Sequence, residues 1–307
     1  MDNRGWSPMR VLVLGSAAGG GFPQWNCRCP VCSLVWAGDA RVTARTQSSL
    51  AVSADGEHWL LLNASPDLRQ QIISNRALHP REGKRHSPIA GVFLTNGDID
   101  HIAGLLTMRE QQAFTVYGTG ATLAQIPPGS VFGVLNRALV KTQTIALDQP
   151  CDTGLGFTVT AFAVPGKVPL YLEGETVEIG GLSESTLGLE IAGPARRFFY
   201  IPGCAEITPA LLERIKGADL LFFDGTTFTD SEMVELGLSQ KTAWRMGHVA
   251  MGGEKGSLAG LADCGIPRRI YIHINNTNPV LISDSPQRAI AEKAGWEIAY
   301  DGMEVVA

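Results

Sequence analysis

Two carboxylates and an imidazole lie close together in residues 95–101, which read Thr-Asn-Gly-Asp-Ile-Asp-His. The apolar run 89–94 before them predicts a buried strand, and residues 102–112 after them predict a helix. Asp98, Asp100 and His101 are therefore expected on a strand-to-helix loop, where parallel α/β sheets place their ligands. Carboxylate oxygens beside an imidazole are suited to a metal ion.

Two further residues of the same kind follow other predicted strands. Asp224 comes directly after the predicted buried strand 219–223, and His273 ends the predicted strand 270–273. His248 lies in a loop rich in glycine and methionine. The chain has only 6 histidines, and the carboxyl ends of strands converge on one rim of a layered α/β fold. We therefore expect a metal site at that rim.

The elements that must position these residues occur in the order strands, then helices, in each half of the chain. Strands are predicted at 10–15, 48–53, 59–63 and 89–94 in the first half, and at 157–162, 187–191, 197–201, 219–223 and 270–273 in the second. Helices are predicted at 66–73, 102–112, 209–216 and 257–262, the first capped by Ser65 with Pro66 at its first position. This order indicates a layered α/β fold, as one large domain or two intimate halves.

Three thiols lie within the loop 16–47, at Cys27, Cys29 and Cys32. This spacing favours a tetrahedral zinc site whose fourth ligand comes from elsewhere in the chain. A redox pair is an alternative, although the extra cysteine is not typical of one, and three unrelated buried cysteines are another. A bound zinc would hold together a loop with little apolar content.

Composition excludes several classes of function. The chain has 307 residues, a net charge of -5 and no marked cluster of Lys and Arg, so nothing supports nucleic-acid binding. No run reaches the roughly 18 apolar residues of a membrane helix, and the polar N-terminal extension 1–8 lacks an apolar signal core. Six cysteines are too few for a disulfide scaffold in a chain of this length, and Cys151, Cys204 and Cys264 are expected to be ordinary buried residues. A cytoplasmic protein is the simplest interpretation.

Several segments resemble the pyrroloquinoline quinone (PQQ) biosynthesis protein B family of the metallo-β-lactamase superfamily. The matching segments are 15–29, 43–49, 63–69, 95–101, 246–248 and 273–279, and the resemblance extends over nearly the whole chain from Met9. It implies an αββα sandwich, in which two mixed sheets pack face to face with helices outside, formed by a single domain over 1–307. It also implies a possible homodimer.

The superfamily's hydrolases carry His-x-His-x-Asp-His on the loop that corresponds to 96–101. The first two histidines are replaced here by Asn96 and Asp98, whereas Asp100 and His101 are retained. The third histidine of the first metal site would fall near 164–166, and the bridging Asp would follow 197–201, but neither is present. The retained residues, with His273, form the one-carboxylate, two-imidazole set of non-haem Fe(II) sites.

The resemblance implies iron-dependent hydroxylation of the tyrosine ring in a peptide-derived Glu–Tyr precursor. In this interpretation Asp98 is a further ligand or an acceptor that orients an imidazole. Asp224 and His248 are candidate proton donors or acceptors. Asn276 occupies the position of the fourth zinc ligand in related phosphodiesterases, although Asn is a weak zinc ligand. Fe, Zn, Mn and Cu are all compatible with the active-site ligands.

Two other functions remain open. The chain could carry PQQ or its precursor for export, which would require cations at the rim, and Arg45, Arg69 and Arg109 are candidates. It could also be a metal-dependent hydrolase of phosphodiesters or lactones. The missing first-site ligands argue against hydrolysis, because a binuclear site requires roughly twice as many protein ligands as this chain retains.

Overall fold

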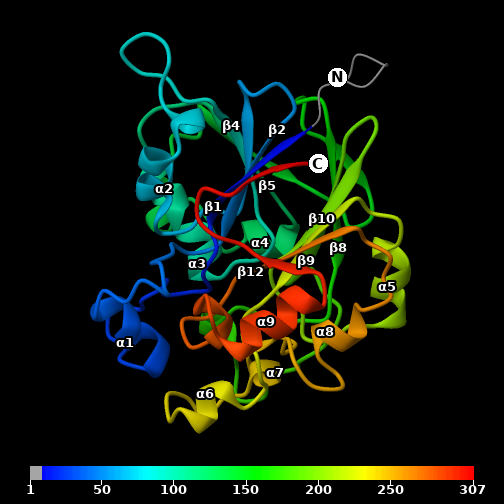
Figure 1. Cartoon of the computed structure of the whole chain (residues 1–307). Coiled ribbons are helices and arrows are strands. Elements are labelled where there is room, and N and C mark those ends of the chain that lie inside the picture. Colours follow the sequence, from blue (N-terminus) through cyan, green and yellow to red (C-terminus); the bar gives the residue numbers. More distant parts are fainter. Residues whose placement is uncertain (1–8) are drawn as a thin grey trace.

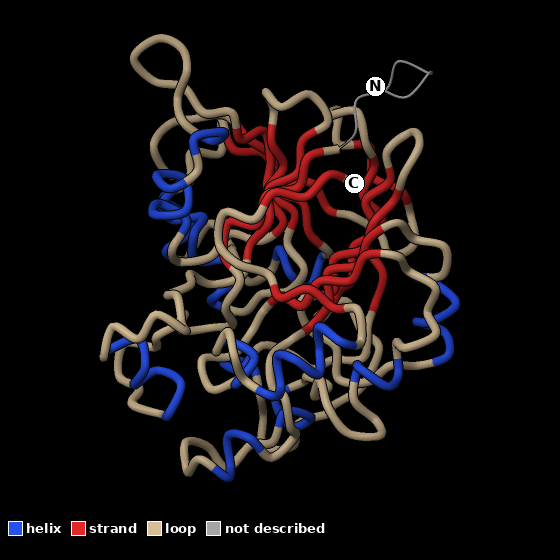
Figure 2. The backbone as a smooth tube through the Cα atoms, viewed as in Figure 1, coloured by secondary structure: helices blue, strands red, loops and turns tan. Residues whose placement is uncertain are grey.

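Two seven-stranded mixed sheets pack face to face, with helices on their outer faces (Figures 1 and 2). The computed structural model describes residues 9–307, so the predicted extension 1–8 lies outside the described residues. This architecture confirms the αββα arrangement expected from the sequence.

The two sheets are built alike, each with a parallel half and an antiparallel half. The first has the order β14-β1-β2-β3-β4-β5-β6 and is parallel from β3 to β6. Its strands are β1 (Arg10–Gly15), β2 (Ser49–Ser53), β3 (Trp59–Leu62), β4 (Ile89–Phe93), β5 (Phe114–Gly118), β6 (Val140–Thr144) and β14 (Glu304–Val306).

The second sheet has the order β13-β12-β11-β10-β9-β8-β7 and is parallel from β10 to β13. Its strands are β7 (Pro150–Asp152), β8 (Thr158–Ala163), β9 (Leu187–Ala192), β10 (Arg197–Ile201), β11 (Leu220–Asp224), β12 (Arg268–Ile272) and β13 (Trp296–Ile298). The sequence did not indicate β5, β6, β7, β13 or β14.

The α-helices are short, and the longest described one, α9, has 8 residues. They are α1 (Pro30–Trp36), α2 (Leu68–Ser74), α3 (Ile99–Ile102), α4 (Gly120–Leu123), α5 (Pro209–Ile215), α6 (Glu232–Glu235), α7 (Ala243–Met246), α8 (Ser257–Gly260) and α9 (Pro286–Lys293). Helix α1 lies inside the predicted loop 16–47, and α4, α6, α7 and α9 were not predicted. None of the described helices is long and apolar enough to cross a membrane.

The central strands are buried on both faces. In β11, Leu220 and Phe222 contribute to the core between the sheets, whereas Leu221 and Phe223 pack beneath the helices of the outer layer. A strand covered on both sides needs apolar residues at every position, which explains why the sequence shows a continuous apolar run there. The polar residue that ends such a strand therefore lies at the edge of the core.

The first predicted helix begins later than expected. Helix α2 starts at Leu68 rather than at residue 66, and its N-cap is Asp67, whose side chain makes no capping hydrogen bond. Ser65 Oγ still accepts the backbone N–H of Asp67 at 3.3 Å, the kind of bond expected of an N-cap, although the regular helix begins only at Leu68. Pro66 and Asp67 form the turn that precedes the helix.

The predicted helix 102–112 is wrong in its extent. The α-helix covers only Ile99–Ile102 and continues as a 3-10 helix over Ala103–Met108. The backbone N–H of Gly104 donates to the Ala64 carbonyl at 2.8 Å, so it leaves the regular helical pattern. A Cβ on Gly104 would lie 2.2 Å from the Ser65 carbonyl oxygen, so this close backbone approach requires glycine.

Candidate metal centre

The predicted ligands Asp100, His101 and His273 lie together at one end of the sandwich. Asp100 and His101 are on α3, which follows β4, and His273 directly follows β12 in the other sheet. Asp100 Oδ2 lies 3.1 Å from His273 Nε2 and 3.6 Å from His101 Nε2. Metal–ligand bonds of about 2.0–2.2 Å place neighbouring ligand atoms at about such separations. The three side chains can therefore hold one metal ion.

The ring of His101 is held in the form that binds a metal. Its Nδ1 lies 2.7 Å from Asn96 Oδ1, so Nδ1–H donates to this amide oxygen and Nε2 is left with its lone pair. Nε2 is buried and has no hydrogen-bond partner among the described residues. A buried nitrogen without a partner is costly, and a metal ion would satisfy it. Asn96, rather than Asp98, is thus the acceptor that orients this imidazole.

The ring of His273 is fixed through Thr226, which the sequence analysis did not identify. Thr226 Oγ1 lies 2.7 Å from Asp224 Oδ1 and 3.0 Å from His273 Nδ1. Because a hydroxyl carries one proton, it donates to the carboxylate and accepts from Nδ1–H, which directs His273 Nε2 toward Asp100. The position of Thr226, two residues beyond a buried strand that ends in Asp, was the available sequence signal.

Asp224 and His248 form a hydrogen-bonded pair beside these ligands. His248 Nδ1 lies 2.7 Å from Asp224 Oδ2, and its ring stacks on His273 with centroids 5.2 Å apart. Asp224 is completely buried and also accepts the backbone N–H of Cys204 at 2.9 Å. Asp224 therefore positions His248 and Thr226, whereas His248, with 17% of its side chain exposed, is the member of the pair that can meet a substrate.

Asp98 lies at the edge of the same site. Its Oδ1 accepts the backbone N–H of Leu170 at 3.3 Å, which ties the segment after β8 to the metal-ligand loop. Asp98 and the three metal-ligand candidates line one cavity of about 450 Å³. The cavity gives the metal position access to a small-molecule substrate.

The cations of this cavity differ from those predicted. Lys167 and Lys241 line it, and neither was identified from the sequence. Arg45, Arg69 and Arg109 are not among its lining residues. Arg45 is buried, and its guanidinium donates to the Ala299 carbonyl instead. The expectation that these three arginines face the site is therefore wrong.

Burial and mutual contact shift the pKa values of the three metal-ligand candidates. Burial alone would raise the pKa of Asp100, but the His101 and His273 imidazoles outweigh it and hold this pKa below its usual range. Burial lowers the pKa of His101. Burial would also lower the pKa of His273, but its hydrogen bond to Asp100 outweighs burial and raises it. These directions favour the metal-binding forms of Asp100 and His101, whereas at His273 a metal ion competes with a proton.

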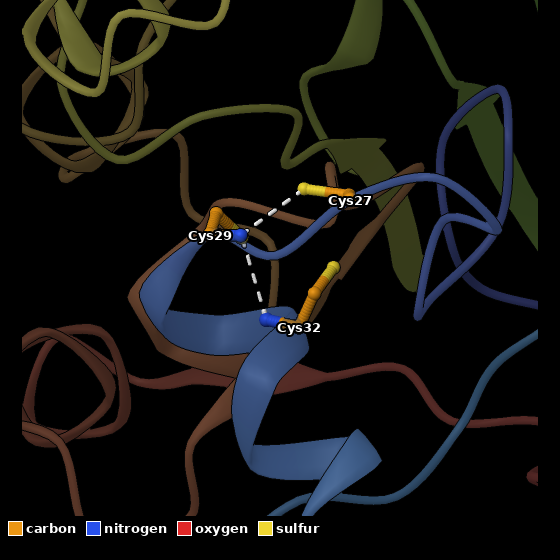
Figure 3. A group of neighbouring side chains, drawn as sticks. All are labelled: Cys27, Cys29 and Cys32. Atoms are coloured by element: carbon orange, nitrogen blue, oxygen red, sulfur yellow. Dashed lines mark hydrogen bonds between the residues drawn. The ribbon is translucent and has the colours of Figure 1, made fainter.

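The three predicted zinc-binding cysteines meet at the start of α1 (Figure 3). The backbone N–H of Cys29 donates to Cys27 Sγ at 3.4 Å, and that of Cys32 donates to Cys29 Sγ at 3.3 Å. All three are buried, and burial raises the pKa of Cys29 to about 12. A bound zinc ion would supply the positive charge that stabilises three buried thiolates.

Asn276 completes the enclosure of the sulfurs. Its Nδ2 lies 3.2 Å from Cys27 Sγ and 3.3 Å from Cys32 Sγ. A half-turn of the amide would exchange Nδ2 for Oδ1 at the same point, so the side chain can act as a donor to thiolates or as an oxygen ligand. The remaining cysteines lie elsewhere: Cys151 and Cys204 are buried as expected, and Cys264 is only half-buried.

The fold and this rim of carboxylates and imidazoles define a metallo-β-lactamase-type domain. The family model described as "Beta-lactamase superfamily domain" matches residues 58–274. Coenzyme PQQ synthesis protein B of Methylorubrum extorquens (strain PA1) is 59% identical over 295 residues, which cover 96% of this chain and 99% of that protein. Coenzyme PQQ synthesis protein B of Xanthomonas oryzae pv. oryzae is 50% identical over 298 residues, covering 97% and 99%. The chain therefore belongs to the coenzyme PQQ synthesis protein B family, which acts in PQQ biosynthesis.

Solved structures agree with this assignment. The crystal structure of Zn²⁺-bound PqqB from Methylobacterium extorquens has a TM-score of 0.95 at 58% identity, and the match covers 97% of this chain and all of that one. A diphosphatase from the PhnP family has a TM-score of 0.67 at 20% identity, covering 97% of this chain and 98% of that chain, which shows a shared fold alone.

Proposed function

We propose that this chain hydroxylates the tyrosine ring of the peptide-derived Glu–Tyr precursor during PQQ synthesis, with iron(II) as its active-site metal. The observation that carries the proposal is the geometry of Asp100, His101 and His273. One carboxylate and two imidazoles are the ligand set of non-haem Fe(II) oxygenases, and such a set leaves coordination positions open.

The reaction inserts one oxygen atom of O₂ into an aromatic C–H bond. The other oxygen atom becomes water, with two electrons and two protons from a reductant such as ascorbate. Iron(II) held by Asp100, His101 and His273 would supply the redox chemistry. His248 donates Nδ1–H to Asp224, which leaves Nε2 as the ring nitrogen that can accept a proton from the substrate phenol.

Hydrolysis is less well supported by the same site. Asn96 and Asp98 stand where the superfamily's hydrolases have histidines, and both are already engaged, with His101 and with the Leu170 backbone. A metal-bridging hydroxide needs a second ligand set that these residues do not provide.

The test is anaerobic reconstitution with Fe(II), addition of the Glu–Tyr precursor and a reductant, and then O₂. We expect oxygen uptake and a product heavier by one oxygen atom, with at least a hundredfold loss in Asp100→Ala and none in Asp263→Ala, which removes an exposed carboxylate. Absence of oxygen uptake and product would refute the proposal. Tight precursor binding without turnover, unchanged by Asp100→Ala, would instead favour the carrier function.

A further inference from the structure

Three cations gather around one carboxylate beside the metal centre. Glu173 lies 2.9 Å from Lys167 Nζ, 3.1 Å from Lys241 Nζ and 3.2 Å from Arg245 Nη2. Glu173 and Lys167 are nearly buried, with 9% and 12% of their side chains exposed. One negative charge is shared by three positive charges, so this cation cluster carries a net charge of about +2. A charge excess of this kind in a partly buried place favours an anionic ligand.

The cation cluster faces the cavity that contains the metal ligands. Lys167 and Lys241 line this cavity together with Asp100, His101, His248 and His273. A ligand that reached the metal position would therefore meet both ammonium groups.

Hydrogen bonds and packing fix the position of the cation cluster relative to the metal centre. The segment that carries Lys167 and Glu173 is tied to the metal-ligand loop, because Leu170 N–H donates to Asp98 and the Tyr171 hydroxyl donates to the Gly97 carbonyl at 2.8 Å. A Cβ on Gly247, next to His248, would lie 3.2 Å from Lys167 Cγ, so the lysine stem packs against this turn.

We propose that Lys167 and Lys241, supported by Arg245, form a subsite that binds a carboxylate of a polycarboxylate substrate and orients the reacting ring toward the metal. This inference rests on the proposed function for the identity of the substrate, because a Glu–Tyr precursor carries several carboxylates. Glu173 would hold the ammonium groups together until the substrate carboxylate arrives. Lysine ammonium groups serve this purpose as strongly hydrated point charges with several donors each.

The binding test uses metal-loaded protein and PQQ, a tricarboxylate, as the probe, with its trimethyl ester as the neutral control. Calorimetry should show binding of PQQ that weakens with added salt and much weaker binding of the ester. Lys167→Gln and Lys241→Gln should each weaken PQQ binding about tenfold, which is the usual order for a charge-assisted hydrogen bond. Lys141→Gln, which alters an exposed lysine on β6, should leave binding unchanged.

Two further variants separate binding from folding. Lys167→Arg should restore most of the affinity, and Glu173→Gln should tighten PQQ binding, because it raises the net positive charge. Metal content should be the same in all variants. Unchanged PQQ affinity in both lysine variants, equal binding of the ester, or no PQQ binding to the unaltered protein would each overturn the subsite.

The subsite and the proposed hydroxylation can each fail without the other, and the experiments tell the two cases apart. In the hydroxylation assay the lysine variants should raise KM about tenfold, and kcat should fall as well, because the ring is then less well oriented toward the metal. If lysine-dependent PQQ binding occurs but no hydroxylation is found, the subsite stands and the proposed reaction falls. If hydroxylation occurs with KM unchanged in both variants, the proposed reaction stands and the subsite falls.

Discussion

At the scale of single residues, Asn96 explains how a replaced histidine position still serves a metal site. Its amide oxygen accepts the Nδ1–H of His101 at 2.7 Å and so presents Nε2 to the metal position. We expect Asn96→Ala to weaken binding of the active-site metal about 10- to 100-fold, the usual effect of losing such an outer hydrogen bond. Asn96→Asp keeps an acceptor oxygen and should retain most of the affinity. Competition with a chromogenic chelator measures both, and an alanine variant that binds as tightly as the unaltered chain would contradict this role.

The sequence predicted which residues would lie together at the metal site, but not the hydrogen bonds and charges around them. Asp100, His101 and His273 could be brought together because each follows an apolar strand, and strand ends share a rim. Thr226 and Lys167 could not be assigned to the site from the sequence, because their roles depend on side-chain rotamers and on the path of irregular loops. Nothing in the spacing of residues distinguishes a hydroxyl that bonds His273 from one that faces solvent.

At the scale of elements, the cysteine site joins two segments that are far apart in sequence. Its thiols belong to the start of α1, and Asn276 belongs to the segment that directly follows His273. The backbone of His273 is left-handed, with φ of 58°, a conformation that is costly for this residue and needs support from its surroundings. A metal held by the cysteines would therefore also stabilise the position of an active-site ligand.

Cys32→Ser tests this coupling. We expect the thermal midpoint to fall by roughly 5 °C, since each kcal/mol lost shifts the midpoint by about 2–4 °C in domains of about 150–250 residues and somewhat less in a larger one. The active-site metal should also bind more weakly. Cys264→Ser, at a half-buried thiol outside the cluster, should change neither quantity. A Cys32→Ser variant with normal active-site affinity would show that the two sites are independent.

The contribution of Glu173, in the loop after β8, to the free energy of unfolding should depend on pH. Burial alone would raise the pKa of Glu173, but hydrogen bonds from Lys167, Arg245 and Lys241 outweigh it and lower the pKa to about 2. A carboxyl whose folded pKa is depressed contributes stability above its unfolded pKa and loses it as pH falls through its folded pKa. The difference in unfolding free energy between the unaltered chain and Glu173→Gln should thus be constant above pH 5 and shrink from about 4.5 toward 2.

Urea unfolding at pH 7, 5, 4 and 3 measures this difference. Glu175→Gln is the matched control, because Glu175 is exposed in the same segment, and its effect should be small at every pH. A Glu173→Gln effect of equal size at pH 7 and pH 3 would contradict the assignment.

At the scale of the whole molecule, the metal site exists only when the two sheets are packed together. From the sequence, the order of strands and helices indicated a layered fold, and the family resemblance implied that two sheets pack face to face. The sequence did not predict β13 and β14, whose 3-residue length gives too little pattern, although β14 closes the first sheet by pairing with β1. Such short elements are defined by their neighbours rather than by local sequence.

Metal binding should therefore stabilise the packing of the sheets. At a metal concentration of 100 times Kd, the free energy of unfolding should rise by about 2.7 kcal/mol, because only the folded chain brings Asp100 and His273 together. His273→Ala should lose this increment, since it removes the ligand from the second sheet. Phe222→Ala, in the core between the sheets, should cost about 3–5 kcal/mol and yet keep the increment, because the ligands are intact in the molecules that remain folded. Denaturant unfolding with and without added metal measures each value, and an increment that survives in His273→Ala would show that the metal does not bind across the two sheets.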